Sequence, residues 1–267
     1  MRRSPEEILF TDDQGGAATL EDVIADGMEG EYADRIPSLI ELLGSGSPYH
    51  RLMACIVLTS WGHPAGFEAI VRWASNPGGT PWAEGPVTVD RIYGTDDAFE
   101  SLADALKTSY WNAETAELQN MQREAAEALL TIYHLSYFGQ TLALALVKDP
   151  VWKTSKQSKI AHTLETCLQT IASGKRPGFD LSYQTACLLL VLAPANDILT
   201  AEISERLIAQ CAENDRTLRE LALALGYANG LATLRTLDEL KRLSRPSVVA
   251  EVDRALTLRQ ERASTST

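Results

Sequence analysis

Residues 37–77 read PSLIELLGSGSPYHRLMACIVLTSWGHPAGFEAIVRWASNP, and this stretch decides the fold. Apolar residues recur at spacings of three and four in residues 52–58 and again in residues 67–73. Such spacing is typical of amphipathic helices, and Pro64 stands where a proline is favoured, in the first turn of the second helix. The stretch therefore predicts two helices joined by the short turn Trp61-Gly62-His63.

The same period continues through most of the chain, and the alternation typical of strands is almost absent. We therefore predict an all-α fold of about thirteen helices. The predicted spans are 18–27, 31–43, 47–61, 64–75, 96–108, 115–136, 139–148, 155–173, 181–193, 200–213, 216–228, 231–244 and 246–261.

A short motif recurs on four of these helices: an Arg or Tyr, an Ala three residues later, and a Leu or Gly seven residues after the first position. A small Ala on one face lets neighbouring helices approach closely, and a helical hairpin that cannot bury its apolar face alone stacks on the next one. The four copies are Arg51, Ala54, Leu58; Arg123, Ala126, Leu130; Tyr183, Ala186, Leu190; and Arg219, Ala222, Gly226.

At these residues the chain resembles HEAT-repeat proteins, most closely over residues 37–77 and 207–243. The resemblance implies a right-handed α-solenoid of degenerate helical hairpins with a concave binding face, and it implies no chemistry. We expect one domain over residues 1–267, with flexible ends at 1–17 and 262–267 and a long inserted loop at 76–95.

Composition favours a folded chain in water. Of the 267 residues 45% are apolar, and the longest nearly unbroken apolar run, residues 186–195, is about half of what a membrane span needs. The N-terminus carries two arginines but continues with carboxylates instead of the apolar core of a signal peptide. We therefore expect a cytoplasmic protein that does not bind membranes.

Nothing in the sequence indicates catalysis, so we expect no enzyme, no cofactor and no metal. The four cysteines and four histidines form none of the spacings that hold zinc, and no nucleophile, phosphate-binding or dinucleotide motif is present. Some HEAT-like proteins do catalyse, among them DNA glycosylases and bilin lyases, and an enzyme of this kind is the third hypothesis below. The cysteines are Cys55, Cys167, Cys187 and Cys211, each within an apolar helical stretch.

Negative charge is concentrated in the first part of the chain. The total charge is −12, and residues 1–120 carry 20 acidic and 7 basic residues, whereas residues 121–267 carry 16 and 17. Such a field repels nucleic acid and attracts basic partners, although it can also serve solubility alone. Lys148, Lys153, Lys156 and Lys159 around Trp152 could form a phosphate patch, but a solvated helix start fits them better.

The inserted loop at 76–95 is the candidate binding site, because it combines aromatic side chains with carboxylates. Alternative interpretations of these residues stay open: Trp82 and Tyr93 could pin the loop to the helices, Thr95 could cap the next helix, and Trp111 could pack in the core. The candidate partner-binding residues are Trp82, Glu84, Asp90, Tyr93, Asp96, Asp97, Glu100 and Trp111.

Three functions follow as hypotheses. The first is an immunity protein of a bacterial polymorphic toxin system, which neutralises a toxin effector domain by covering its basic active-site region and is a monomer or a heterodimer with that partner. Several immunity proteins of this kind resemble short HEAT arrays, and many protein partners of nucleases are acidic. The second is a HEAT-like adaptor that assembles proteins without inhibiting them, and the third is a catalytic HEAT-like protein.

Overall fold

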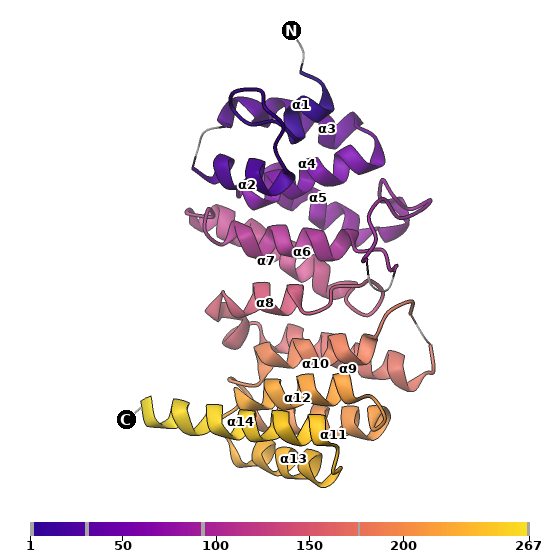
Figure 1. Cartoon of the computed structure of the whole chain (residues 1–267), viewed down its shortest axis with the longest axis vertical. Coiled ribbons are helices and arrows are strands. Elements are labelled where there is room, and N and C mark those ends of the chain that lie inside the picture. Colours follow the sequence, from indigo (N-terminus) through magenta and orange to yellow (C-terminus); the bar gives the residue numbers. More distant parts are fainter. Residues whose placement is uncertain (1–2, 30–31, 92–93, 176, 266–267) are drawn as a thin grey trace. The chain divides into compact units, whose positions relative to one another are not determined.

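The computed structural model describes residues 3–29, 32–91, 94–175 and 177–265, and over these residues it is all-helical, which confirms the predicted fold class (Figure 1). The described residues contain two isolated β-bridges and no β-strand. The α-helices are α1 Pro5–Leu9, α2 Leu20–Met28, α3 Ile36–Ser45, α4 Pro48–Ser60, α5 Pro64–Ser75, α6 Ala98–Ser109, α7 Ala116–Thr131, α8 Thr141–Val147, α9 Gln157–Ala172, α10 Leu181–Leu192, α11 Asp197–Cys211, α12 Asp215–Gly226, α13 Leu231–Arg242 and α14 Pro246–Thr265. Three 3-10 helices accompany them: η1 Ala33–Arg35, η2 Pro77–Gly79 and η3 Pro150–Lys153.

Each of the thirteen predicted helices corresponds to one of α2 to α14, and α5 spans the residues predicted for it. Caps account for the shifted ends. Helix α11 begins three residues before its predicted start, because the side chain of Asn196 accepts a hydrogen bond from the N–H of Leu199 at 3.1 Å. Helix α14 continues to Thr265, within the tail that the sequence predicts to be flexible.

The chain divides into two compact units, Met1–Ile132 (unit 1) and Tyr133–Thr267 (unit 2), where the sequence predicts one domain. In unit 1, α4 packs on α3, α5 and α6, and α5 packs on α7. The recurring motif lies at these contacts, since Ala54, Leu58 and Ala126 are each fully buried. Small side chains at these positions bring the helix backbones close together.

Unit 2 contains two rows of helices: α10 packs on α12 and α12 on α14, whereas α9 packs on α11 and α11 on α13 (Figure 1). The motif residues Ala186 and Ala222 are fully buried here as well. Gly226 makes the tightest approach, because a Cβ atom at this position would lie 3.1 Å from the Cα atom of Ala255 in α14. The pattern of small residues therefore corresponds to close helix packing in both units.

The N-terminal segment is anchored to unit 1, although the sequence predicts it to be flexible. Ser4 and Glu7 form a capping box at the start of α1, and Leu9 is fully buried. The Arg35 side chain, only 3% exposed, donates hydrogen bonds to the carbonyls of Ile8, Thr11 and Asp12 at 2.8–3.1 Å. The carbonyls of an irregular segment thus satisfy a buried guanidinium, an arrangement that has no periodic signature in the sequence.

A buried glutamine organises the start of unit 2. Gln184 of α10 donates to the carbonyls of Tyr133 and Ser136 at 2.7 and 3.1 Å, and its Oε1 accepts from the N–H groups of Phe138 and Gly139. The Tyr133 hydroxyl donates to the Gln184 carbonyl at 2.8 Å. These bonds hold residues 133–139 in a turn, and the helix predicted over 115–136 accordingly ends at Thr131.

No helix within the described ranges has both the length and the apolar character that crossing a membrane requires.

Candidate functional site

The tryptophan expected to anchor a partner is part of the core of unit 1. Trp82 is 4% exposed, and its ring packs edge-on against Trp73 and Phe99, with ring centroids 5.0 and 5.7 Å away. The prediction that Trp82 inserts into a partner is therefore corrected. Of the two alternatives left open by the sequence, the structure supports the one in which this side chain pins the insert, residues 76–95, to the helices.

Beyond Trp82, hydrogen bonds join residues of the insert to one another and to the residue that follows it. The N–H of Asp90 donates to the carbonyl of Thr95 at 2.8 Å, the N–H of Gly94 donates to the carbonyl of Asp90 at 2.8 Å, and Val89 forms a β-bridge with Asp96. Tyr93, the second predicted aromatic anchor, lies outside the described residues. The part of the insert that the structure describes presents no aromatic side chain to a partner.

Four of the predicted acidic residues, Asp90, Asp96, Asp97 and Glu100, lie at the end of the insert or the start of α6, whereas Glu84 lies in the turn after Trp82. The N-cap of α6 is Asp97, which corrects the expectation that Thr95 caps this helix. Asp96 Oδ1 accepts a hydrogen bond from the N–H of Ala98 at 3.0 Å, and the carboxylates here favour the positive end of the helix dipole. Glu84 and Asp96 are exposed, whereas Asp90, Asp97 and Glu100 are half-buried.

One carboxylate at this helix start, that of Asp96, lies where its charged form is disfavoured. Burial and the neighbouring charge of Asp97 raise the pKa of Asp96, although its hydrogen bond from Ala98 opposes this shift. The Oδ1 atom of Asp97 is buried and makes no hydrogen bond within the described part of the chain. Folding therefore favours the protonated form of Asp96 relative to the unfolded chain.

Trp111, the last predicted site residue, is strongly exposed. Its side chain is 73% accessible, which excludes the alternative of core packing. It follows the C-terminal end of α6, whereas the insert precedes the N-terminal end, and a helix of this length separates the two by about 18 Å. The structure therefore places Asp96, Asp97 and Glu100 at one end of α6 and Trp111 beyond the other.

Sequence reasoning missed the residues that support Trp111. Asn112 Nδ2 donates to the carbonyl of Ser60 at 2.9 Å, and Trp61 Nε1 donates to the carbonyl of Ile24 at 3.0 Å. Gly27 allows α2 to approach, because a Cβ atom there would overlap the Trp61 indole. A glycine inside the apolar-periodic span 18–27 is the sequence signal that points to this close contact.

The two units differ in net charge. Unit 1 contains 22 acidic and 8 basic residues, a balance of −14, and unit 2 contains 14 and 16, a balance of +2. One of the eight cations of unit 1, Arg35, is buried against backbone carbonyls and does not neutralise the surface. The surface of unit 1 is therefore strongly acidic, as the sequence predicts.

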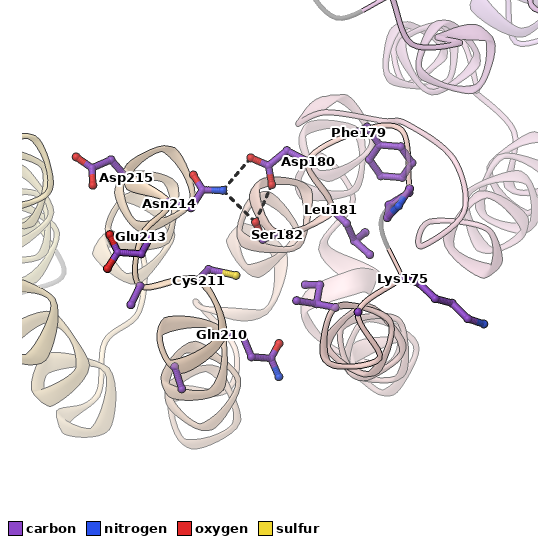
Figure 2. Close-up of a pocket in the computed structure, with 15 residues that line it drawn as sticks. Lys175, Phe179, Asp180, Leu181, Ser182, Gln210, Cys211, Glu213, Asn214 and Asp215 are labelled. Carbon is purple, nitrogen blue, oxygen red and sulfur yellow. Dashed lines mark hydrogen bonds between the residues drawn. The ribbon is translucent and has the colours of Figure 1, made fainter.

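Unit 2 contains an open groove of about 870 Å³ beside the α9–α10 and α11–α12 turns (Figure 2). The polar groups on its wall hydrogen-bond to one another: Asn214 Nδ2 donates to Asp180 at 3.0 Å and to Ser182 at 3.2 Å, and Ser182 donates to Asp180 at 2.6 Å. Burial by itself would raise the pKa of Asp180. Hydrogen bonds from Ser182, Asn214 and Tyr183 outweigh this effect, so the pKa is lowered. These groups cap helices α10 and α12 and are satisfied without a ligand.

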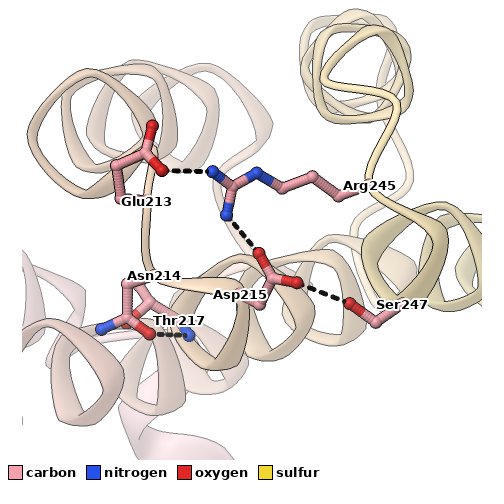
Figure 3. Close-up of polar contacts among 6 residues, drawn as sticks. All are labelled: Glu213, Asn214, Asp215, Thr217, Arg245 and Ser247. Atoms are coloured by element: carbon pink, nitrogen blue, oxygen red, sulfur yellow. Dashed lines mark hydrogen bonds and ion pairs between the residues drawn. The ribbon is translucent and has the colours of Figure 1, made fainter.

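A second polar cluster joins the α13–α14 turn to the α11–α12 turn (Figure 3). Arg245 pairs with Glu213 at 2.7 Å and with Asp215, and Ser247 donates to Asp215 at 2.9 Å. The hydrogen bonds from Arg245 and Ser247 lower the pKa of Asp215. Asp180, Glu213 and Asp215 at the groove thus each have a partner within unit 2.

The remaining candidate groups are structural. Trp152 is fully buried, and Lys156 lies 5.7 Å from its ring centroid, so the lysine cluster has no exposed aromatic partner there. Burial raises the pKa of the Cys55 and Cys167 thiols to about 12, which keeps both protonated at neutral pH. The described residues contain no group of three or more His, Cys, Asp or Glu side chains placed to hold a metal ion.

Comparisons with known proteins give no match: no family model fits the sequence, and neither a curated protein nor a solved structure is significantly similar to it.

Proposed function

We propose that the chain binds a basic protein through the acidic surface of unit 1 and that, as an immunity protein, it blocks the active-site region of a toxin effector domain. The observation that carries this proposal is the charge imbalance, −14 in unit 1 against +2 in unit 2. A field of this sign raises the local concentration of a basic partner and speeds its encounter. Inhibition then needs only coverage of the partner's substrate-binding cleft.

The finer architecture belongs to the same proposal. Alternate helices in contact, with buried alanines at the recurring motif, support a right-handed HEAT-like solenoid whose repeats present a continuous surface. We place the protein in the cytoplasm as a monomer that pairs with its partner. In this proposal it acts without cofactor, metal, nucleic acid or membrane, and without catalysis of its own.

Charge reversal in each unit tests this proposal. One variant carries Glu84→Lys, Asp96→Lys and Glu114→Lys in unit 1, and the control carries Glu202→Lys, Glu205→Lys and Glu239→Lys in unit 2. All six residues are exposed, and each variant replaces three carboxylates by three lysines, so both variants change the net charge by the same amount. We expect the wild type and the control to capture one basic protein at low salt, and the unit 1 variant to lose it.

The activity of the captured protein then separates inhibitor from adaptor. A decrease in that activity on adding the wild-type chain supports the immunity proposal, whereas binding with unchanged activity favours the adaptor. Equal capture by the two variants would show that the acidic surface of unit 1 does not select the partner, and the proposal would fail.

A further inference from the structure

We propose that the partner is held at the Trp111 edge of unit 1 by an arginine-rich segment whose guanidinium groups stack on the Trp111 indole. The Trp111 edge comprises Trp111, Glu114 and Glu117 at the α6–α7 turn, Trp61 at the α4–α5 turn, and Asp26 at the end of α2. This inference rests on the proposed function and specifies which face of unit 1 performs it.

Trp111 differs from the other tryptophans in its exposure. Trp73, Trp82 and Trp152 are at most 4% exposed, and Trp61 is half-buried with its indole N–H bonded to a backbone carbonyl. Trp111 is 73% exposed. Tryptophan is usually among the most buried side chains in a folded protein, and it is enriched where proteins bind one another. An indole on a turn at the surface is therefore a suitable anchor for a partner.

The backbone that carries Trp111 is held firmly against its neighbours. Asn112 Nδ2 donates to the Ser60 carbonyl at 2.9 Å, and Gly62, with a φ of 72°, brings the α4–α5 turn against the backbone of Asn112. Trp61, which lies in the same α4–α5 turn, packs against Gly27 of α2. Two inter-helix turns and the end of α2 thus form one continuous edge, so an anchor on this edge loses little freedom when a partner binds.

The charges along the edge select a cationic partner. Glu114 and Glu117 are exposed beside Trp111, and Asp26 lies at the end of α2, where it accepts a hydrogen bond from Tyr32 at 3.0 Å. The nearby Lys107 is paired with Asp104. Burial lowers the pKa of His63, so its ring adds no positive charge at neutral pH.

An aromatic face beside carboxylates recognises arginine better than lysine. The guanidinium group is planar and weakly hydrated, so it stacks on an indole while its N–H groups bond to carboxylates, whereas the ammonium group of lysine is a strongly hydrated point charge. The insert offers carboxylates without an exposed aromatic side chain in its described part, and so it would not discriminate between the two cations.

Binding of deca-arginine and deca-lysine peptides tests this inference on the full chain. Four variants are compared with the wild type: Trp111→Ala, Trp111→Phe, Leu231→Ala and the double variant Glu84→Gln/Asp96→Asn. Leu231 is the matched control, because it is also 73% exposed but lies in unit 2. Circular dichroism verifies that each variant is folded, and titration at several salt concentrations gives the affinities.

We expect the wild type to bind deca-arginine more tightly than deca-lysine. Trp111→Ala should weaken deca-arginine binding about threefold to tenfold and remove most of the preference for arginine, and Trp111→Phe should retain part of both. Leu231→Ala should bind as the wild type does, and the insert variant should lose affinity for both peptides to a similar, smaller extent.

The other outcomes separate the two proposals. If Trp111→Ala binds as the wild type does and the insert variant loses most of the affinity, the Trp111 edge is excluded but the acidic surface remains the binding surface. If the wild type binds neither peptide, both proposals fail. Self-association that sedimentation detects and that Trp111→Ala abolishes would assign the edge to a second copy of this chain and would overturn the inference.

Discussion

Units 1 and 2 are both helical, but the side chains that hold their irregular segments differ in chemistry. In unit 1 the Arg35 guanidinium binds the N-terminal segment, whereas the apolar ring of Trp82 fastens the insert. In unit 2 polar groups do both jobs: Gln184 holds the segment that begins the unit, and Arg245 ties one turn to another. The units also differ in net charge, since unit 2 is nearly neutral and unit 1 is strongly acidic.

The binding that we propose uses the excess negative charge of unit 1, whereas the internally bonded polar groups of unit 2 contribute to stability. Side chains that cap helices and bridge turns are satisfied internally, so they have little to offer a partner. Exposed carboxylates without enough cations to neutralise them repel one another, which costs stability but attracts a basic protein. The predictions below test whether the two units depend on these different interactions.

The largest effect is expected for Trp82→Ala. Removing a buried indole that packs on two aromatic rings should lower the free energy of unfolding of unit 1 by about 3–5 kcal/mol. The exposed Trp111→Ala is the matched control and should change stability by less than about 0.5 kcal/mol. Hydrogen exchange resolved along the chain, combined with denaturant unfolding, measures both. Similar losses for the two variants would contradict the assignment of Trp82 to the core.

In unit 2 the corresponding prediction concerns Gln184. Gln184→Leu leaves two N–H groups and two carbonyls of residues 133–139 without their side-chain partner, and we expect a loss of about 2–4 kcal/mol. Gln169→Ala is the control, because Gln169 is exposed and bonds only to Glu165 among the hydrogen bonds of its side chain described here. Faster hydrogen exchange should concentrate in residues 133–139. A loss no larger than that of the control would show that solvent satisfies these groups.

A smaller, salt-dependent effect is expected for Arg245→Ala. Removing this guanidinium separates the α11–α12 turn from the start of α14, so hydrogen exchange should accelerate in both segments. The control Arg254→Ala breaks a pair with Glu251 inside α14 and should leave the turns unchanged. Because the pairs are at the surface, high salt should reduce the difference. An effect that does not depend on salt would indicate packing rather than charge.

The smallest expected effect is an opposite response of the two units to acid. The pKa of Asp96 is raised in the folded state, so its ionised form destabilises unit 1 at neutral pH, and this cost disappears as the pH falls through the raised pKa. The pKa of Asp180 is lowered, so its contribution to unit 2 is present above the unfolded value, about 3.9, and is lost as the pH falls through the folded value.

Two amide variants isolate these contributions. Asp96→Asn should stabilise the start of α6 at neutral pH, and the stability of this helix start should then no longer increase on acidification. Asp180→Asn should remove the decrease in the stability of the start of α10 below about pH 4. Hydrogen exchange at the two helix starts, measured across pH, checks the signs. The same direction of change in both units would contradict the assigned environments.

Much of the fold could be predicted from the sequence because helices have a local signature. Spacings of three and four residues, with Pro64 at a helix start, identified thirteen helices, and the buried alanines of the motif lie at helix contacts. Helix α1 was missed because its burial depends on Arg35, which is more than twenty residues away. The early end of α7 was missed because Gln184 holds the residues that follow it.

The candidate site shows where local patterns stop being informative. Sequence by itself determined the helical periods, the apolar helix faces and the negative charge of unit 1, since these follow from residue identity and spacing. It did not distinguish Trp82 from Trp111, because both lie outside the periodic segments. Only the tertiary structure decided that one is buried on Trp73 and Phe99 and that the other is exposed. The burial of a side chain in a loop depends on which distant elements pack against it, and no local spacing encodes that.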